Sequence, residues 1–187
     1  MGKLIYVTNM SLDGFIEDAR GRFDWTDPSD EVFSFVTDLV RPIGTWLYGR
    51  RLYEAMAVWE TDAALAAQSP LNAEFAAVWQ AGEKVVYSTT LDAPTTARTR
   101  IERRFDPAEV RAIKATDTSD LAIGGAALAA HAFTAGLVDE CQLLVHPALV
   151  GQGKPAFPVH PRVALLTLLD ERRFDNGTVY LRYATQP

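Results

Sequence analysis

The N-terminal part of the chain changes from a continuous apolar run to a helical pattern of apolar positions. Residues 4–10 are apolar and rich in strand formers, which predicts a buried first strand that leads into a loop reaching about Thr26. Asp27 precedes Pro28, a residue suited to the first helical position, so this segment predicts a helix with Asp27 as its N-cap. The apolar positions of this helix are Val32, Phe35, Val36, Leu39 and Val40.

Strands and helices continue to alternate through the middle of the chain. The apolar runs predict strands over residues 45–48, 84–87, 100–105 and 121–123. The helical patterns predict helices over residues 51–56, 107–115 and 126–135. The alanine-rich stretch over residues 62–81, interrupted at Pro70, is either helical or loop-like. Gly136 suits the C-terminal end of the last helix.

The final third of the chain is dominated by strand patterns. Residues 141–145 and 162–174 contain strand segments, and the Asp-Asn-Gly-Thr sequence at 175–178 predicts a hairpin with a type I′ turn. We therefore expect an α/β fold whose central sheet is mixed, mostly parallel, with antiparallel C-terminal strands and flanking helices. At 187 residues, the chain is expected to form one domain over residues 1–187.

Composition narrows the classes of function. The net charge is −6 without a lysine or arginine run, which argues against a nucleic-acid partner. Cys141 is the only cysteine, so an intrachain disulfide and a cysteine-based zinc site are excluded, and His131, His146 and His160 lack metal-ligand spacing. No apolar run approaches the roughly 20 residues of a membrane helix, and the N-terminus lacks signal-peptide features. We expect a cytoplasmic protein without a metal or a membrane partner.

Three candidate ligand sites follow predicted strands, where open α/β sheets bind ligands. Gly124-Gly125 precedes a helix and could receive a phosphate on free backbone amides, although a tight turn explains the pair about as well. Gly49-Arg50-Arg51 could offer guanidinium groups to phosphate, or the arginines could be an exposed pair at a helix start. The hydroxyls at residues 88–90 could donate to phosphate or cap a turn.

Asp13 and Asp30 are the candidate acids. Asp13 precedes Gly14 and is by default a turn residue, and Asp30 in the first helical turn would complement the helix dipole whatever the function. A carboxylate that faces a pocket could instead hydrogen-bond the N–H groups of a heterocycle and help to deliver a proton.

Several short motifs, taken in order over nearly the whole chain, resemble the dihydrofolate-reductase superfamily. The most similar branch is the reductase domain that forms the C-terminal half of the bacterial riboflavin-biosynthesis deaminase-reductase. The motifs are SLDGFI at 11–16, GRRLYE at 49–54, LAIGG at 121–125, and AGLVDE at 135–140 leading through His146-Pro147 to GQGKPAF at 151–157. The zinc-deaminase motifs of the bifunctional enzyme are absent from this sequence.

The resemblance implies an NADPH-binding reductase that forms a homodimer, with C-terminal strands and the 146–157 region as its expected interface. The implied cofactor-binding residues are Gly49, Arg50, Arg51, Ser88, Thr89, Thr90, Gly124, Gly125, Ala126 and Ala127. The arginines would favour NADPH over NADH, and the Gly124–Gly125 bond would be a cis peptide.

The resemblance also implies a small heterocyclic substrate, pyrimidine-like or pterin-like, that receives a hydride from the cofactor. Asn9, Trp25 and Tyr53 are the implied substrate-binding residues, and Asp30 and Asp13 are the implied catalytic residues. A dihydrofolate reductase proper remains an alternative, although Asp27-Pro28-Ser29 replaces the Leu-Pro of that type. Another alternative is a homodimer that binds a nucleotide or flavin without turnover.

Overall fold

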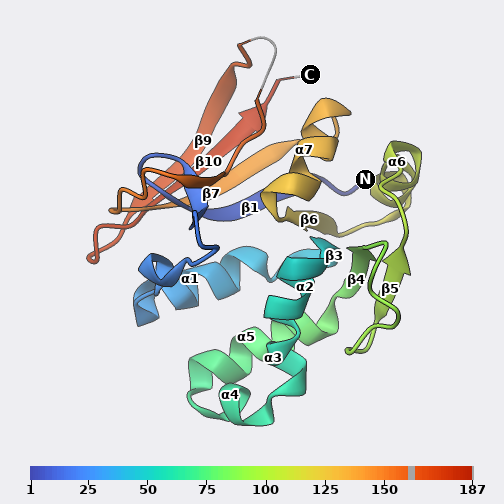
Figure 1. Ribbon diagram of the computed structural model, residues 1–187, viewed down its shortest axis with the longest axis horizontal. Helices are drawn as coiled ribbons and strands as arrows, with labels where there is room; N and C mark the ends of the chain where they lie inside the picture. Colours follow the sequence, from blue (N-terminus) through green and yellow to red (C-terminus); the bar gives the residue numbers. More distant parts are fainter. Residues whose placement is uncertain (160–162, 187) are drawn as a thin grey trace.

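An eight-stranded sheet forms the middle layer of the protein, as the computed structural model in Figure 1 shows; residues 1–159 and 163–186 are described. In sheet order its strands are β5 (Thr99–Glu102), β4 (Glu83–Tyr87), β3 (Ile43–Gly49), β6 (Asp120–Gly124), β1 (Leu4–Ser11), β7 (Glu140–His146), β10 (Val179–Thr185) and β9 (Leu166–Arg173). The strands from β5 to β7 are mutually parallel, and β10 is antiparallel to both of its neighbours. The predicted α/β class, with a mostly parallel sheet and antiparallel C-terminal strands, is confirmed.

Helices cover both faces of this sheet (Figure 1). The helices are η1 (Asp24–Thr26), α1 (Asp30–Val40), α2 (Arg50–Met56), α3 (Val58–Thr61), α4 (Ala63–Ala67), α5 (Pro70–Ala81), α6 (Pro107–Thr116) and α7 (Ala126–Thr134). Helices α6 and α7 pack on one face through Val110, Leu128 and Ala132. Helices α1, α2 and α5 pack on the other face through residues that include Val40 and Trp79. Because both faces are covered, the central strands are buried and appear in the sequence as continuous apolar runs.

A second, two-stranded sheet pairs β2 (Phe15–Asp18) with β8 (Gly153–Pro155). The sequence patterns did not predict either strand, because each is too short to show an alternation. The backbones of β2 and β8 lie very close together at Gly153, since a Cβ atom there would collide with the carbonyl oxygen of Glu17. This small sheet joins the loop after β1 to the loop after β7.

The start of α1 differs from the prediction. Ser29, rather than Asp27, is the N-cap, and its hydroxyl accepts a hydrogen bond from the amide of Val32 at 3.4 Å. Pro28 lies before the helix instead of in its first turn. Ser29 has the extended backbone of an N-cap residue, with φ −65° and ψ 162°, and its side chain satisfies an amide that the helix leaves unpaired.

The C-terminal hairpin is present, but its turn is not of type I′. Phe174 and Thr178 are paired through the amide of Phe174 and the carbonyl of Thr178, and Gly177 donates to the carbonyl of Phe174. Gly177 has φ +84°, whereas Asn176 has no positive φ, and a type I′ turn needs two such residues. The connection is therefore a three-residue loop with its glycine in the left-handed region.

Several other helices and strands begin or end at residues that differ from the predicted ones. Pro70 begins α5 rather than interrupting a helix, and β5 ends at Glu102, before Phe105. The strand predicted over residues 162–174 is observed as β9, while His160 and Arg162 lie outside the described residues. In the part of the chain that is described, no helix has the length and apolar character needed to cross a membrane.

Candidate functional site

The carboxyl ends of the parallel strands bring most of the candidate residues to one edge of the sheet. Gly49 ends β3, Ser88 follows β4, Gly124 ends β6 and His146 ends β7. The residues at this edge fall into two groups. One group lies beyond β3, β4 and β5, and the other lies beyond β1 and β7.

The first group lines a hollow of about 370 Å³. Its lining residues are Gly49, Tyr87, Ser88, Thr89, Thr90, Arg103, Arg104, Phe105, Ala127, Leu128 and His131. Five of the residues implied as cofactor-binding are in this list: Gly49, Ser88, Thr89, Thr90 and Ala127.

Arg103 and Arg104 add positive charge to this hollow and His131 adds an imidazole, and sequence reasoning missed all three. Arg103 donates to the carbonyls of Ser88 at 3.0 Å and Leu91 at 2.8 Å, so its side chain holds the turn after β4. The side chain of Arg104 is 86% exposed, with one distant ion pair to Asp106 at 3.8 Å. The signal was present in the sequence, because two arginines directly follow the end of β5 just as Arg50-Arg51 follow β3.

Two sets of hydrogen-bond donors that lack a partner lie near Arg103 and Arg104. The hydroxyl of Tyr87 is buried and has no hydrogen-bond partner among the described residues. Burial raises the pKa of Tyr87, so its hydroxyl keeps its proton at neutral pH. Helix α7 begins after Gly125, which has φ +86° and supplies no side-chain cap, so the first amides of the helix, including those of Ala126 and Ala127, stay available to an anion. The peptide bond between Gly124 and Gly125 is trans, contrary to the expectation of a cis bond.

Arg50 and Arg51 begin α2 beside Gly49, but neither lines the hollow. Arg51 forms an ion pair with Glu17 of β2 at 3.7 Å, and Arg50 forms one with Glu54 at 3.8 Å. Both guanidinium groups are thus placed near carboxylates of the chain itself.

The second group centres on His146, which is only 2% exposed. Its Nε2 lies 2.9 Å from Asn9 Oδ1, and its Nδ1 lies 3.4 Å from the hydroxyl of Thr178. The indole of Trp25 meets the imidazole edge-to-face, with 5.9 Å between ring centroids. The structure therefore brings together two of the implied substrate-binding residues, Asn9 and Trp25, around a histidine that the sequence analysis did not assign to the site.

The indole N–H of Trp25 is buried without a hydrogen-bond partner in the described part of the chain. Burial lowers the pKa of His146, so its ring is neutral at neutral pH. This part of the edge therefore presents uncharged hydrogen-bonding groups, in contrast to the cationic hollow.

Tyr53, the third implied substrate-binding residue, lies in the core under α2 and is 1% exposed. Its hydroxyl accepts hydrogen bonds from the amides of Thr95 at 2.8 Å and Thr96 at 3.1 Å. In this position Tyr53 fixes the loop after β4 rather than facing the two groups at the edge.

The two candidate acids have different surroundings. Asp13 accepts hydrogen bonds from the Ser11 hydroxyl at 2.6 Å and from the amides of Val150 and Gly151, the latter at 2.7 Å. The Ser11 bond, followed by that from Val150, lowers the pKa of Asp13 to about 2, so this carboxylate joins two loops as an ionised group. Asp30 is exposed in the first turn of α1, and its carboxylate makes no hydrogen bond or ion pair within the described residues.

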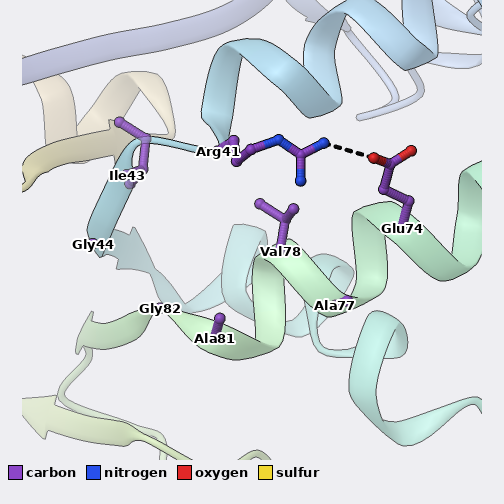
Figure 2. A pocket seen from close by; sticks show the side chains of 8 residues that line it. All are labelled: Arg41, Ile43, Gly44, Glu74, Ala77, Val78, Ala81 and Gly82. Carbon is purple, nitrogen blue, oxygen red and sulfur yellow. Dashed lines mark hydrogen bonds and ion pairs between the residues drawn. The ribbon is translucent and has the colours of Figure 1, made fainter.

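Another hollow of about 340 Å³ lies at the opposite, amino edge of the sheet, near the start of β3 (Figure 2). Its two charged residues, Arg41 and Glu74, are paired with each other at 2.6 Å. Its other lining side chains come from apolar residues such as Val78 and Ala81. It offers no unpaired charge to a ligand and lies apart from the candidate groups.

Comparisons with known proteins agree with this architecture. The protein YyaP of Bacillus subtilis (strain 168), which is uncharacterized, is 30% identical over 184 residues, covering 97% of this chain and 94% of that protein. A solved structure of a proposed riboflavin biosynthesis protein from Shewanella sp. PV-4 matches with a TM-score of 0.77 and 19% identity, covering 99% of both chains.

A bifunctional protein from Thermotoga maritima shares the fold as well. It is a diaminohydroxyphosphoribosylaminopyrimidine deaminase and 5-amino-6-(5-phosphoribosylamino)uracil reductase, and it matches with a TM-score of 0.65 and 13% identity over 99% of this chain and 57% of its own. The family model described as the RibD C-terminal domain matches residues 2–180. By this match and by its fold, the chain belongs to the RibD C-terminal domain family.

Proposed function

We propose that this protein is an NADPH-dependent reductase of the riboflavin-biosynthesis type, which transfers a hydride to a small pyrimidine-like or pterin-like substrate. The observation that carries the proposal is the cationic hollow beyond β4 and β5. An acidic protein that places Arg103, Arg104 and His131 beside free helix amides has a local site suited to phosphate groups.

The distance between the two groups of residues favours an elongated ligand. The strands β4 and β1 are three strand spacings apart in the sheet, which corresponds to roughly 14 Å. A dinucleotide could lay its phosphates in the hollow, cross Gly124-Gly125, and end beside the group around His146. Gly125 supports this path, because a Cβ atom at this position would meet no other atom within 4 Å.

NADPH would supply a hydride when bound, and the chain would position the reacting groups. Asn9 and Trp25 would hold the heterocycle by hydrogen bonds. Asp30 is the better candidate for relaying a proton, since the carboxylate of Asp13 is engaged in hydrogen bonds from Ser11, Val150 and Gly151. Asp13 would act mainly by ordering the loops that border the substrate.

The proposal is tested by titrating the purified protein with NADPH and with NADH while its fluorescence is monitored. Removing one guanidinium that contacts a phosphate should weaken NADPH binding about tenfold or more. We therefore expect Arg104→Ala to lose this much affinity for NADPH, while its affinity for NADH stays almost unchanged. Arg111→Ala is the matched control, because Arg111 is an exposed arginine on α6 outside the hollow. Arg50→Ala tests whether the arginines of α2 also contribute.

Three outcomes would contradict parts of this proposal. No binding of either nucleotide would exclude the reductase and leave a scaffold for another ligand. An equal loss of NADPH and NADH binding in Arg104→Ala would exclude recognition of the ribose phosphate by Arg104. Tight NADPH binding without oxidation by dihydrofolate, pyrimidine or quinone-like acceptors, and without change in Asp30→Asn, would favour the non-catalytic binder.

We also propose that the protein forms a homodimer through β9. Every residue of this edge strand is exposed, and its leucines include Leu168 and Leu169, which are 50% and 47% exposed. An edge strand with apolar side chains and unpaired backbone groups is a template for pairing with a second copy.

We also propose that the protein is cytoplasmic, because its single cysteine, Cys141, is buried as a free thiol and disulfides are typical of oxidising compartments.

A further inference from the structure

The carboxamide of Asn9 can face a ligand in two ways that differ chemically. One end of the group, Oδ1, accepts hydrogen bonds, and the other, the Nδ2 amino group, donates them. In the structure Oδ1 lies 2.9 Å from Nε2 of His146, so Nε2 must carry the proton and Nδ2 is the end left over. Asn9 itself is exposed near the carboxyl end of β1, where a ligand could reach that amino group.

The contact on the other side of the imidazole is compatible with the same assignment. Nδ1 of His146 is 3.4 Å from the hydroxyl of Thr178, a residue that is fully buried. A hydroxyl can either donate to Nδ1 or accept from it, so with the ring proton assigned to Nε2 by the Asn9 contact, the Thr178 hydroxyl is the donor here. The edge-to-face contact with Trp25 limits rotation of the ring about its own axis.

We propose that His146 is a positioning residue, which together with Thr178 holds the Asn9 carboxamide so that its amino group faces the site as a fixed donor. The site then selects ligands that present a carbonyl oxygen at this point, and disfavours those that present an amino group. The indole of Trp25 packs against His146, and its buried N–H has no partner among the described residues. This inference deepens the proposed function, and its ligand part rests on that function.

The first experiment needs no ligand. In protein labelled with ¹⁵N-histidine, we expect one histidine whose proton is on Nε2 and whose nitrogen signals disappear in His146→Phe. In Asn9→Asp, a carboxylate beside Nε2–H should favour the charged ring, so the same histidine should become protonated at a higher pH than in the native protein. A proton on Nδ1, or a titration that Asn9→Asp leaves unchanged, would overturn the positioning role.

The second experiment uses uracil and cytosine, which present a carbonyl oxygen and an amino group, respectively, at C4, while the neighbouring N3 carries a hydrogen in uracil and none in cytosine. We expect the native protein to bind uracil about five- to tenfold more tightly than cytosine, measured by the shift of the Asn9 amino protons. The preference should disappear in Thr178→Val, which removes the hydroxyl at nearly constant volume, and should persist in Thr116→Val, a control at an exposed position of α6.

These measurements separate the two proposals. If the histidine experiment succeeds but cytosine binds as well as uracil, the ligand selectivity is wrong while the positioning of Asn9 stands. If NADPH binds as proposed but His146 carries its proton on Nδ1, the cofactor site stands and the positioning role is wrong. Circular dichroism of His146→Phe shows whether that variant folds, and Thr178→Val supplies the test if it does not.

Discussion

Glu140 shows how a buried charge is held in this molecule. Its side chain is only 3% exposed, and it accepts hydrogen bonds from Lys3 at 2.6 Å and from Arg182 at 2.7 and 3.1 Å. Burial by itself opposes ionisation, but the bonds from Arg182 and Lys3 outweigh it, so the pKa of Glu140 lies below its ordinary value. The three residues tie the N-terminal end of β1 to β7 and β10.

A pH-dependent loss of stability follows from this carboxylate. Because its pKa is lower in the folded than in the unfolded chain, its stabilising contribution is present above about pH 4.3 and is lost as the pH falls through the folded pKa. We expect Glu140→Gln to lower the free energy of unfolding at pH 7 by about 2 kcal/mol, as for hydrogen bonds to charged groups, and the difference from the native protein to shrink in acid.

Urea unfolding of both proteins at pH 7 and at pH 3 measures this difference. Glu83→Gln is the control, because Glu83 forms an exposed pair with Arg98 at 3.2 Å and such pairs contribute little. A Glu140→Gln deficit that is equal at both pH values would show that the charge of Glu140 is not what stabilises the fold.

At the scale of single residues, the sequence analysis selected polar residues whose hydrogen-bond partners it could not predict. Asp13 and Tyr53 were identified as site residues, yet their polar atoms are bonded to loops far along the chain, at residues 150–151 and 95–96. Hydrogen bonds between residues so distant in sequence leave no local pattern. Arg103 and Arg104 could have been found, because they follow a strand end by the same rule that selected Arg50 and Arg51.

At the scale of elements, the small sheet of β2 and β8 is the connection that orders the loops near the candidate substrate group. Its tightest point is Gly153, where any side chain would collide with the backbone of Glu17. Asp13 joins the same two loops a few residues away, through Val150 and Gly151.

We therefore expect Gly153→Ala to separate β2 from β8 without unfolding the main sheet. The collision is with backbone, which cannot move aside as a side chain can, and overpacking of this kind costs about 1–3 kcal/mol. Amide hydrogen exchange should become faster in residues 15–18 and 150–155, while the amides of β1 and β7 stay protected. Lys154→Ala, in the same strand but with the pairing intact, is the control; unchanged exchange in Gly153→Ala would refute this role.

At the scale of the whole molecule, the sheet is covered unevenly. The strands from β4 to β7 lie between helices, whereas β9 is exposed over its whole length at one edge. A charged side chain placed on β9 should therefore affect association of two copies far more than folding.

We expect Leu168→Asp to convert a dimer into a monomer, measured by light scattering coupled to size-exclusion chromatography. The added carboxylate would be buried without a partner in the dimer but solvated in the monomer. Val58→Asp is the matched control, since Val58 is another exposed apolar residue, located on α3. A native protein that is monomeric, or a Leu168→Asp variant that remains dimeric, would exclude β9 as the interface.

The sequence by itself determined the order and type of the main elements and the α/β class. This was possible because strands buried on both faces are continuously apolar, while helices show their period locally. Its motifs also indicated the family to which the comparisons assign the chain, and the rule that ligands bind beyond strand ends predicted the edge of the sheet where the candidate groups lie.

Only the tertiary structure decided which polar residues meet at that edge. The parallel order β5-β4-β3-β6-β1-β7 places Arg103 and Arg104 beside Ser88 and His131, and it places Asn9 beside His146, 137 residues away. The same packing directs Tyr53 into the core and joins Asp13 to a distant loop. These partnerships depend on strand order and register, which are set by the burial of many side chains together and not by the residues that form the site.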